Sequence, residues 1–128
     1  MLIRDIVIHC SDTPNGREHN AEDIHRWHIE RGFDGIGYHY VIKLDGTIEN
    51  GRPEYWIGAH ASGHNSGSIG ICLIGRDDYT DLQIHSLDSL VCKLQKKYKG
   101  VKVIGHNEIS KKECPGFDVQ RWLTHGFK

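Results

Sequence analysis

Two histidines and a cysteine, far apart in the sequence, have side chains and positions suited to a metal site. His9 follows the apolar run Ile6–Ile8, and His106 follows another apolar run at 101–105. Cys114 lies further on, in a polar loop. Two imidazoles and a thiolate suit a zinc ion with one coordination position left open for water. An open position of this kind is typical of a catalytic site rather than a structural one.

The chemistry of such a site is hydrolysis in the common case. A bound zinc ion lowers the pKa of its water to about 7, which makes hydroxide available at neutral pH, and it polarises a scissile carbonyl. The spacing alone is weak evidence, because no short motif joins His9 to His106. The alternative is a capping histidine, a surface histidine and a buried thiol that never meet.

Length and charge exclude several classes of protein. The chain has 128 residues and a formal net charge of −1, which predicts one domain, 1–128, with a core of its own. Nothing in this charge balance indicates nucleic acid or an anionic membrane as a partner. No stretch approaches the roughly 20 apolar residues of a transmembrane helix, and the N-terminus lacks a signal-peptide pattern. We therefore expect a monomer made in a cytosol.

The four cysteines form no C-x-x-C pair. In a reducing cytosol they are expected to be free thiols. Cys72 lies in an apolar run and Cys92 in the apolar stripe of a helix, so both are expected to be buried. Cys114 alone lies beside proline and glycine in a polar loop.

Hydrophobic periodicity predicts alternating strands and helices. Strands are expected at 3–9, 37–43, 47–50, 68–74 and 101–105, and helices at about 20–32, 80–100 and 118–124. Asp45-Gly46 predicts a tight turn between the second and third strands. This order predicts an α/β fold with a single mixed sheet flanked by helices. His9 and His106 then fall at strand ends, where such folds place their sites.

Several longer stretches resemble one enzyme family. They occur in the family's order, cover nearly the whole chain, and read VIHCS (7–11), GYHYVIK (37–43), DGT (45–47), GR (51–52), HA (60–61), SIGICLIG (68–75) and KECPGFD (112–118). On these stretches the chain resembles the zinc-dependent N-acetylmuramoyl-L-alanine amidases (amidase type 2) found in bacteriophage endolysins. The resemblance implies the fold shared by these amidases and the peptidoglycan-recognition proteins.

The resemblance also implies roles for individual residues. It makes His9, His106 and Cys114 the ligands of one zinc ion, and Tyr38 and Lys112 the catalytic residues. A positive charge at Lys112 would stabilise a tetrahedral oxyanion, typically by a few kcal/mol. The phenol of Tyr38 would either orient the zinc-bound water or donate a hydrogen bond to the oxyanion. Tyr38 is expected to begin a strand that lies beside the strand of His9.

Several of these residues have plainer alternatives. Without the resemblance, Tyr38 is one face of a half-buried strand and Lys112 is a solvated loop lysine. His60 and Asn65 match substrate-binding positions of the family, and the alternative for both is hydrogen bonding inside their own loop. Glu108 is a weak candidate for a general base, against a surface or capping role.

In this family the bond cut joins the lactyl group of N-acetylmuramic acid to L-alanine of the peptidoglycan stem peptide. The resemblance implies a phage or prophage endolysin that accumulates in the host cytoplasm before it reaches the cell wall. Alternatives are a cytosolic amidase that recycles wall fragments and a non-hydrolytic peptidoglycan-binding module on the same fold. Binding modules of that kind can lack the thiolate ligand, so Cys114 favours the enzyme. Nothing in the sequence supports a third alternative, a regulator that binds a host protein.

Overall fold

Strands and helices alternate along the chain in the predicted order. The computed structural model of the protein describes residues 2–126, so the expected domain boundaries at 1 and 128 lie outside the described residues. The strands are β1 (Asp5–Cys10), β2 (Tyr40–Ile42), β3 (Ile48–Asn50), β4 (Ser68–Leu73) and β5 (Lys102–Gly105). The α-helices are α1 (Ala21–Glu30), α2 (Asp81–Lys97) and α3 (Val119–His125), and a 3₁₀ turn, η1 (His106–Glu108), follows β5. Among the helices described, none is long and apolar enough to cross a membrane.

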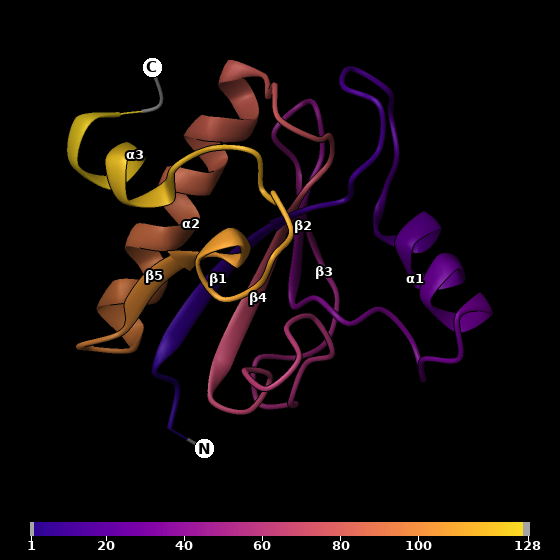
Figure 1. Ribbon diagram of the computed structural model, residues 1–128, viewed down its shortest axis with the longest axis horizontal. Helices are drawn as coiled ribbons and strands as arrows, with labels where there is room; N and C mark the ends of the chain where they lie inside the picture. Colours follow the sequence, from indigo (N-terminus) through magenta and orange to yellow (C-terminus); the bar gives the residue numbers. More distant parts are fainter. Residues whose placement is uncertain (1, 127–128) are drawn as a thin grey trace.

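The strands form one mixed sheet in the order β3-β2-β4-β1-β5 (Figure 1). β4 and β5 both pair with β1 in parallel, and β2 pairs with β4 in parallel. β3 pairs with β2 in the antiparallel direction, across the predicted turn at Asp45-Gly46, where Gly46 has a positive φ of 86°. The prediction of a single mixed sheet flanked by helices is therefore confirmed.

The predicted position of the Tyr38 strand is wrong. Tyr38 precedes β2, which begins at Tyr40, and β2 lies next to β4 rather than β1. The reason is the composition of β4, in which every residue is buried. A strand that is apolar on both faces is most stable in the middle of a sheet, so β4 separates β1 from β2.

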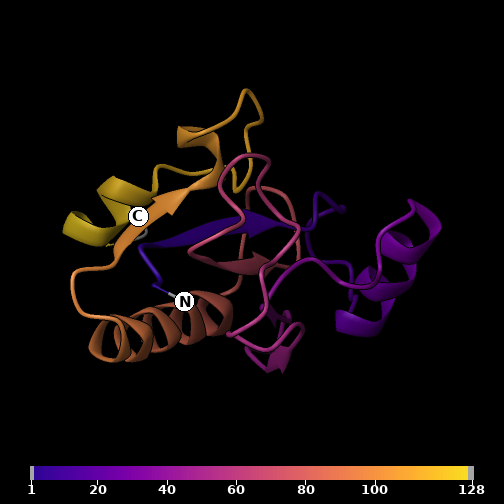
Figure 2. The same cartoon turned by 90° about the horizontal axis from the view of Figure 1, so that it is seen from below.

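The two faces of the sheet have different roles. Side chains alternate between the faces along a strand, so Ile6 and Ile8 of β1 point to one face and His9 to the other. Ile6 and Ile8 belong to the main core, which includes the buried stripe of α2, Leu87, Leu90, Val91 and Leu94. Figure 2 shows α2 on this face and the segment that follows β5 on the opposite face. The face that carries His9 holds the site and a smaller core, formed by Ile24, Ile36, Val41, Cys72 and Ile74.

The expectation that Cys92 is buried is wrong, whereas Cys72 is buried as predicted. Each helical residue is rotated by about 100° from the one before it. Cys92 directly follows Val91 of the buried stripe and is turned out of it, so its side chain is exposed.

Helix α1 holds the segment before β2 in place. It begins with a capping box between Asn20 and Asp23. The buried His28 accepts a hydrogen bond on Nδ1 from the backbone N–H of Gly37, at 2.9 Å. His25 accepts one in the same way from Ile36, at 3.0 Å. These two bonds fix the backbone directly before Tyr38.

The free energy of unfolding should depend on pH through His28. Burial, with smaller contributions from nearby cationic groups, lowers the pKa of His28 from 6.5 to about 4. Between these values the unfolded chain binds this proton and the folded chain does not, so the free energy of unfolding should fall as the pH drops from 6.5 towards 4. Denaturant unfolding at several pH values should show a shallower decline for His28→Gln than for the wild type.

His85→Gln, which removes an exposed histidine from α2, is the matched control. It should keep the wild-type decline. A decline of His28→Gln equal to that of the wild type would contradict the assignment.

Candidate metal centre and cleft

The parallel pairing of β1 and β5 brings His9 and His106 together. Ile8 pairs with Gly105, so the residues that follow these two, His9 of β1 and His106 at the start of η1, lie at the same end of the paired strands. The two ring centroids are 4.4 Å apart. One nitrogen from each ring and the Sγ atom of Cys114 all lie within 4.8 Å of one another. The three predicted ligand residues therefore converge.

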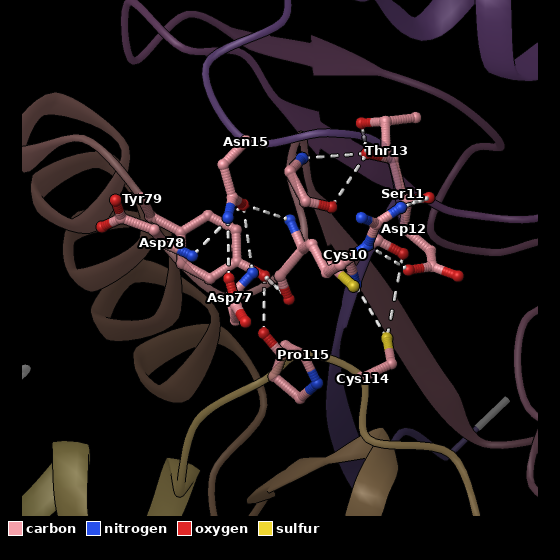
Figure 3. Close-up of polar contacts among 12 residues, drawn as sticks. Cys10, Ser11, Asp12, Thr13, Asn15, Asp77, Asp78, Tyr79, Cys114 and Pro115 are labelled. Carbon is pink, nitrogen blue, oxygen red and sulfur yellow. Dashed lines mark hydrogen bonds and ion pairs between the residues drawn. The ribbon is translucent and has the colours of Figure 1, made fainter.

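Cys114 is held at the end of β1 by two hydrogen bonds. The backbone N–H of Cys10 donates to its Sγ atom at 2.9 Å. The buried hydroxyl of Tyr79 donates to the backbone carbonyl of Pro115 at 2.5 Å, which fixes the residue after Cys114. Figure 3 shows Cys10 beside the thiol of Cys114, and Tyr79 beside Pro115. The loop that carries the sulfur is thus tied both to β1 and to the start of α2.

The two imidazoles are kept neutral. Burial is the main cause that lowers the pKa of His9 well below its ordinary value, followed by the neighbouring His60, His106 and Lys112. Burial also lowers the pKa of His106, with Lys112 as the next cause. A neutral imidazole has a free lone pair on one nitrogen, which is the form that binds a metal.

The surroundings of the Cys114 thiol favour its protonated form. The hydrogen bond between the thiols of Cys10 and Cys114, together with burial, raises the pKa of Cys114 above its ordinary value, while the backbone N–H of Cys10 acts in the opposite direction. A bound divalent metal deprotonates a coordinating thiol. Two neutral imidazoles and one such thiol are a donor set for a metal that prefers nitrogen and sulfur.

The cluster lies in the wall of a cleft of about 1750 Å³. The seven residues assigned to the site from the sequence all line this cleft, as does Glu108: His9, Tyr38, His60, Asn65, His106, Lys112 and Cys114. The structure thus brings together every residue of the predicted site, although they come from five separate segments of the chain.

Tyr38 and Lys112 both act on the cluster. The ring centroid of Tyr38 is 5.1 Å from that of His9, although β4 lies between β1 and β2, the strand that Tyr38 precedes. Burial raises the pKa of the Tyr38 phenol well above its ordinary value, so the hydroxyl stays protonated and can donate a hydrogen bond. Lys112 is exposed on the loop before Cys114, and its positive charge acts on both His9 and His106.

The sequence left alternative roles open for three residues, His60, Asn65 and Glu108, and each of them makes specific contacts. The Nδ1 atom of His60 lies 2.8 Å from Nε2 of His9. The Oδ1 atom of Asn65 accepts hydrogen bonds from the backbone N–H groups of His60 and Ala61, both at 2.8 Å, which is the loop-internal alternative. The carboxylate of Glu108 accepts from the N–H of Gly105 at 2.6 Å and caps η1.

Sequence reasoning missed the contact of His60 with His9, as well as the contributions of Cys10 and Tyr79. His9 and His60 are 51 residues apart, and no periodic pattern joins them. Cys10 is adjacent to His9 in the sequence, and its backbone N–H donates a hydrogen bond to the loop. Such a contact leaves no signature in the residue type.

The chain matches one enzyme family over most of its length. Residues 1–117 match the sequence family described as N-acetylmuramoyl-L-alanine amidase. The endolysin of Escherichia phage T7 is 42% identical over 125 residues, which cover 91% of this chain and 83% of the relative.

Two solved structures show the same fold. The N-acetylmuramoyl-L-alanine amidase LysC from Clostridium intestinale URNW superposes with a TM-score of 0.86 at 33% identity, covering 98% of this chain and 87% of that one. Drosophila PGRP-LB, a peptidoglycan-recognition protein, superposes with a TM-score of 0.85 at 28% identity, covering 99% and 84%. The predicted fold class, shared by amidases and recognition proteins, is confirmed.

Metal binding by the cluster should depend on Cys114 and not on the exposed Cys92. Cys114→Ser removes the sulfur donor, so its affinity for a divalent metal should fall by more than the roughly 10–100-fold typical when only a hydrogen-bond partner of a ligand is lost. Cys92→Ser should bind as the wild type does. Titration with Co²⁺, followed by the sulfur-to-metal absorption band and by competition with a chelator, measures both. Equal affinities for the two variants would rule out Cys114 as a ligand.

Proposed function

As the chain belongs to the N-acetylmuramoyl-L-alanine amidase family, we propose that it hydrolyses the amide bond between N-acetylmuramic acid and L-alanine in peptidoglycan. The observation that carries the proposal is the convergence of His9, His106 and Cys114 in the wall of an open cleft, with Tyr38 beside them. We place catalysis and substrate binding in this cleft, within a single catalytic domain that acts as a monomer.

One zinc ion is the metal that best fits the donor set. Zinc takes imidazole nitrogen and thiolate sulfur in tetrahedral geometry, and three protein ligands leave a fourth position open. His9 and His106 offer neutral nitrogens, and Cys114 offers the sulfur. When bound, zinc supplies a Lewis acid for the amide carbonyl and a nucleophile from water at neutral pH.

Tyr38 and Lys112 would stabilise the charge that develops during hydrolysis. As water adds to the amide carbon, negative charge grows on the carbonyl oxygen. The protonated phenol of Tyr38 can donate a hydrogen bond to that oxygen, and its partly buried position removes competition from solvent. The ammonium of Lys112 is exposed at the rim and can approach the same oxygen when substrate enters. Donors of this kind typically contribute about 3–4 kcal/mol each.

We further propose that the protein is a phage endolysin, which collects in the host cytoplasm and then degrades the cell wall. The endolysin of Escherichia phage T7, 42% identical, supports this role. A cytosolic amidase that recycles wall fragments would use the same site chemistry. Non-hydrolytic binding is the second candidate, because the fold is shared with Drosophila PGRP-LB. The presence of a thiol at Cys114 in the cluster favours hydrolysis.

The reaction can be tested with purified protein and isolated peptidoglycan. Metal analysis should find about one zinc per chain. Digestion should release stem peptides with a new amino terminus on L-alanine, and it should create no new reducing sugar ends. Reducing ends without new amino termini would identify a glycosidase, and binding without release by folded, zinc-loaded protein would identify a recognition module.

The assigned roles of Tyr38 and Lys112 predict losses of activity without loss of zinc. Tyr38→Phe keeps the ring but removes the hydroxyl, and Lys112→Ala removes the charge. Each should lower kcat/KM by roughly 100- to 1000-fold, while zinc content stays at the wild-type level. Lys111→Ala removes the neighbouring exposed lysine and is the matched control. If Lys111→Ala is impaired and Lys112→Ala is not, the assignment to Lys112 is wrong.

A further inference from the structure

His60 lies behind His9, with Nδ1 of His60 2.8 Å from Nε2 of His9. We infer that His60 is a positioning residue for His9: it determines which ring nitrogen of His9 carries the proton and which faces the metal. The inference rests on the proposed metal centre and deepens it. It gives His60 a role different from the substrate contact that the family resemblance implies.

The protonation of His60 follows from its other neighbour, Ser68. The Oγ atom of Ser68 lies 2.6 Å from the carbonyl oxygen of His64, 3.1 Å from that of Asn65 and 3.0 Å from Nε2 of His60. Carbonyl oxygens can only accept, so the single hydroxyl hydrogen of Ser68 goes to the backbone. Its oxygen must then accept from His60, which places the ring proton of His60 on Nε2.

This arrangement fixes the tautomer of His9. A neutral His60 with its proton on Nε2 has a bare Nδ1, which can only accept. His9 must therefore donate from Nε2, and its own Nδ1 keeps the lone pair that a metal needs. Histidine ligands commonly donate their second ring N–H to a neighbouring group, which orients the ring. Here the acceptor is an uncharged imidazole, so it orients His9 without adding negative charge beside the metal.

The ring of His60 sits in a slot between two glycines. A Cβ atom added at Gly58 would lie 2.6 Å from Cδ2 of His60, and one added at Gly70 would lie 2.6 Å from Cγ. His39 bridges the two walls of this slot: its Nδ1 accepts from the N–H of Gly70 at 3.0 Å, and its Nε2 bonds the carbonyl of Trp56 at 2.8 Å. The slot holds the ring where it meets His9.

The contacts of His60 argue against direct substrate binding. Both ring nitrogens are engaged, Nδ1 with His9 and Nε2 with Ser68. Its backbone N–H is bonded to Asn65. A substrate would have to break the bond to His9 or the bond to Ser68 to reach a nitrogen of this ring.

Two substitutions separate the proposed role from simple filling of space. His60→Leu keeps much of the bulk but removes the acceptor for His9, so zinc affinity should fall about 10–100-fold in competition with a chelator. His60→Asn offers an amide oxygen close to the position of Nδ1 and should recover most of that loss. His85→Leu, at an exposed position on α2, is the control and should bind zinc as the wild type does.

Ring-nitrogen NMR of the zinc-loaded, ¹⁵N-histidine-labelled wild type tests the tautomer directly. The expected result is a proton on Nε2 of both His9 and His60, with the metal on Nδ1 of His9. A metal on Nε2 of His9, or wild-type zinc affinity in folded His60→Leu, would overturn the inference. The NMR result stands even if His60→Leu does not fold.

Different results would contradict the proposed function and the proposed role of His60. Wild-type protein that binds zinc with this tautomer but releases no stem peptide would contradict the proposed function and leave the role of His60 intact. Zinc-dependent release together with unchanged zinc affinity in His60→Leu would contradict only the role of His60.

Discussion

The parallel pairing of β1 with β4 on one side and β5 on the other is the constraint on which the rest of the structure depends. It places His9 and His106 at one edge of the sheet and on one face. The other face packs against the apolar stripe of α2. Because side chains alternate along β1, Ile6 and Ile8 face the main core, whereas His9 faces the cleft.

Burial keeps several polar groups of the cleft wall uncharged. Burial disfavours charge on His9, His106 and Tyr38, whereas Lys112 remains exposed. Burying polar groups is costly unless they are hydrogen-bonded, and no buried side-chain nitrogen or oxygen in residues 2–126 lacks a partner. The cluster is thus a set of neutral, oriented donors, to which a cation would add the dominant charge.

Local sequence signals were enough to predict the strands, the helices and the tight turn, because caps, turn residues and periodicity act over a few residues. They also placed His9 and His106 at strand ends. The order of the strands was not accessible in this way: β2 lies beside β4 because of how β4 is buried, which is a property of the whole sheet. The contact between His60 and His9 joins β1 to a loop residue 51 positions further along the chain. It depends on the absence of side chains at Gly58 and Gly70 as much as on the histidines themselves.

The placement of the four thiols has a practical consequence. Cys10 and Cys72 are buried and Cys114 is half-buried in the cluster, whereas Cys92 is exposed on α2. Helix α2 covers the face of the sheet opposite His9 (Figure 2). A maleimide linker on Cys92 would therefore attach the protein to a bead or sensor surface through the side of the molecule opposite the cleft. The cleft would then face the surrounding liquid, where it can meet suspended particles of an insoluble polymer. No cysteine would have to be engineered for this attachment.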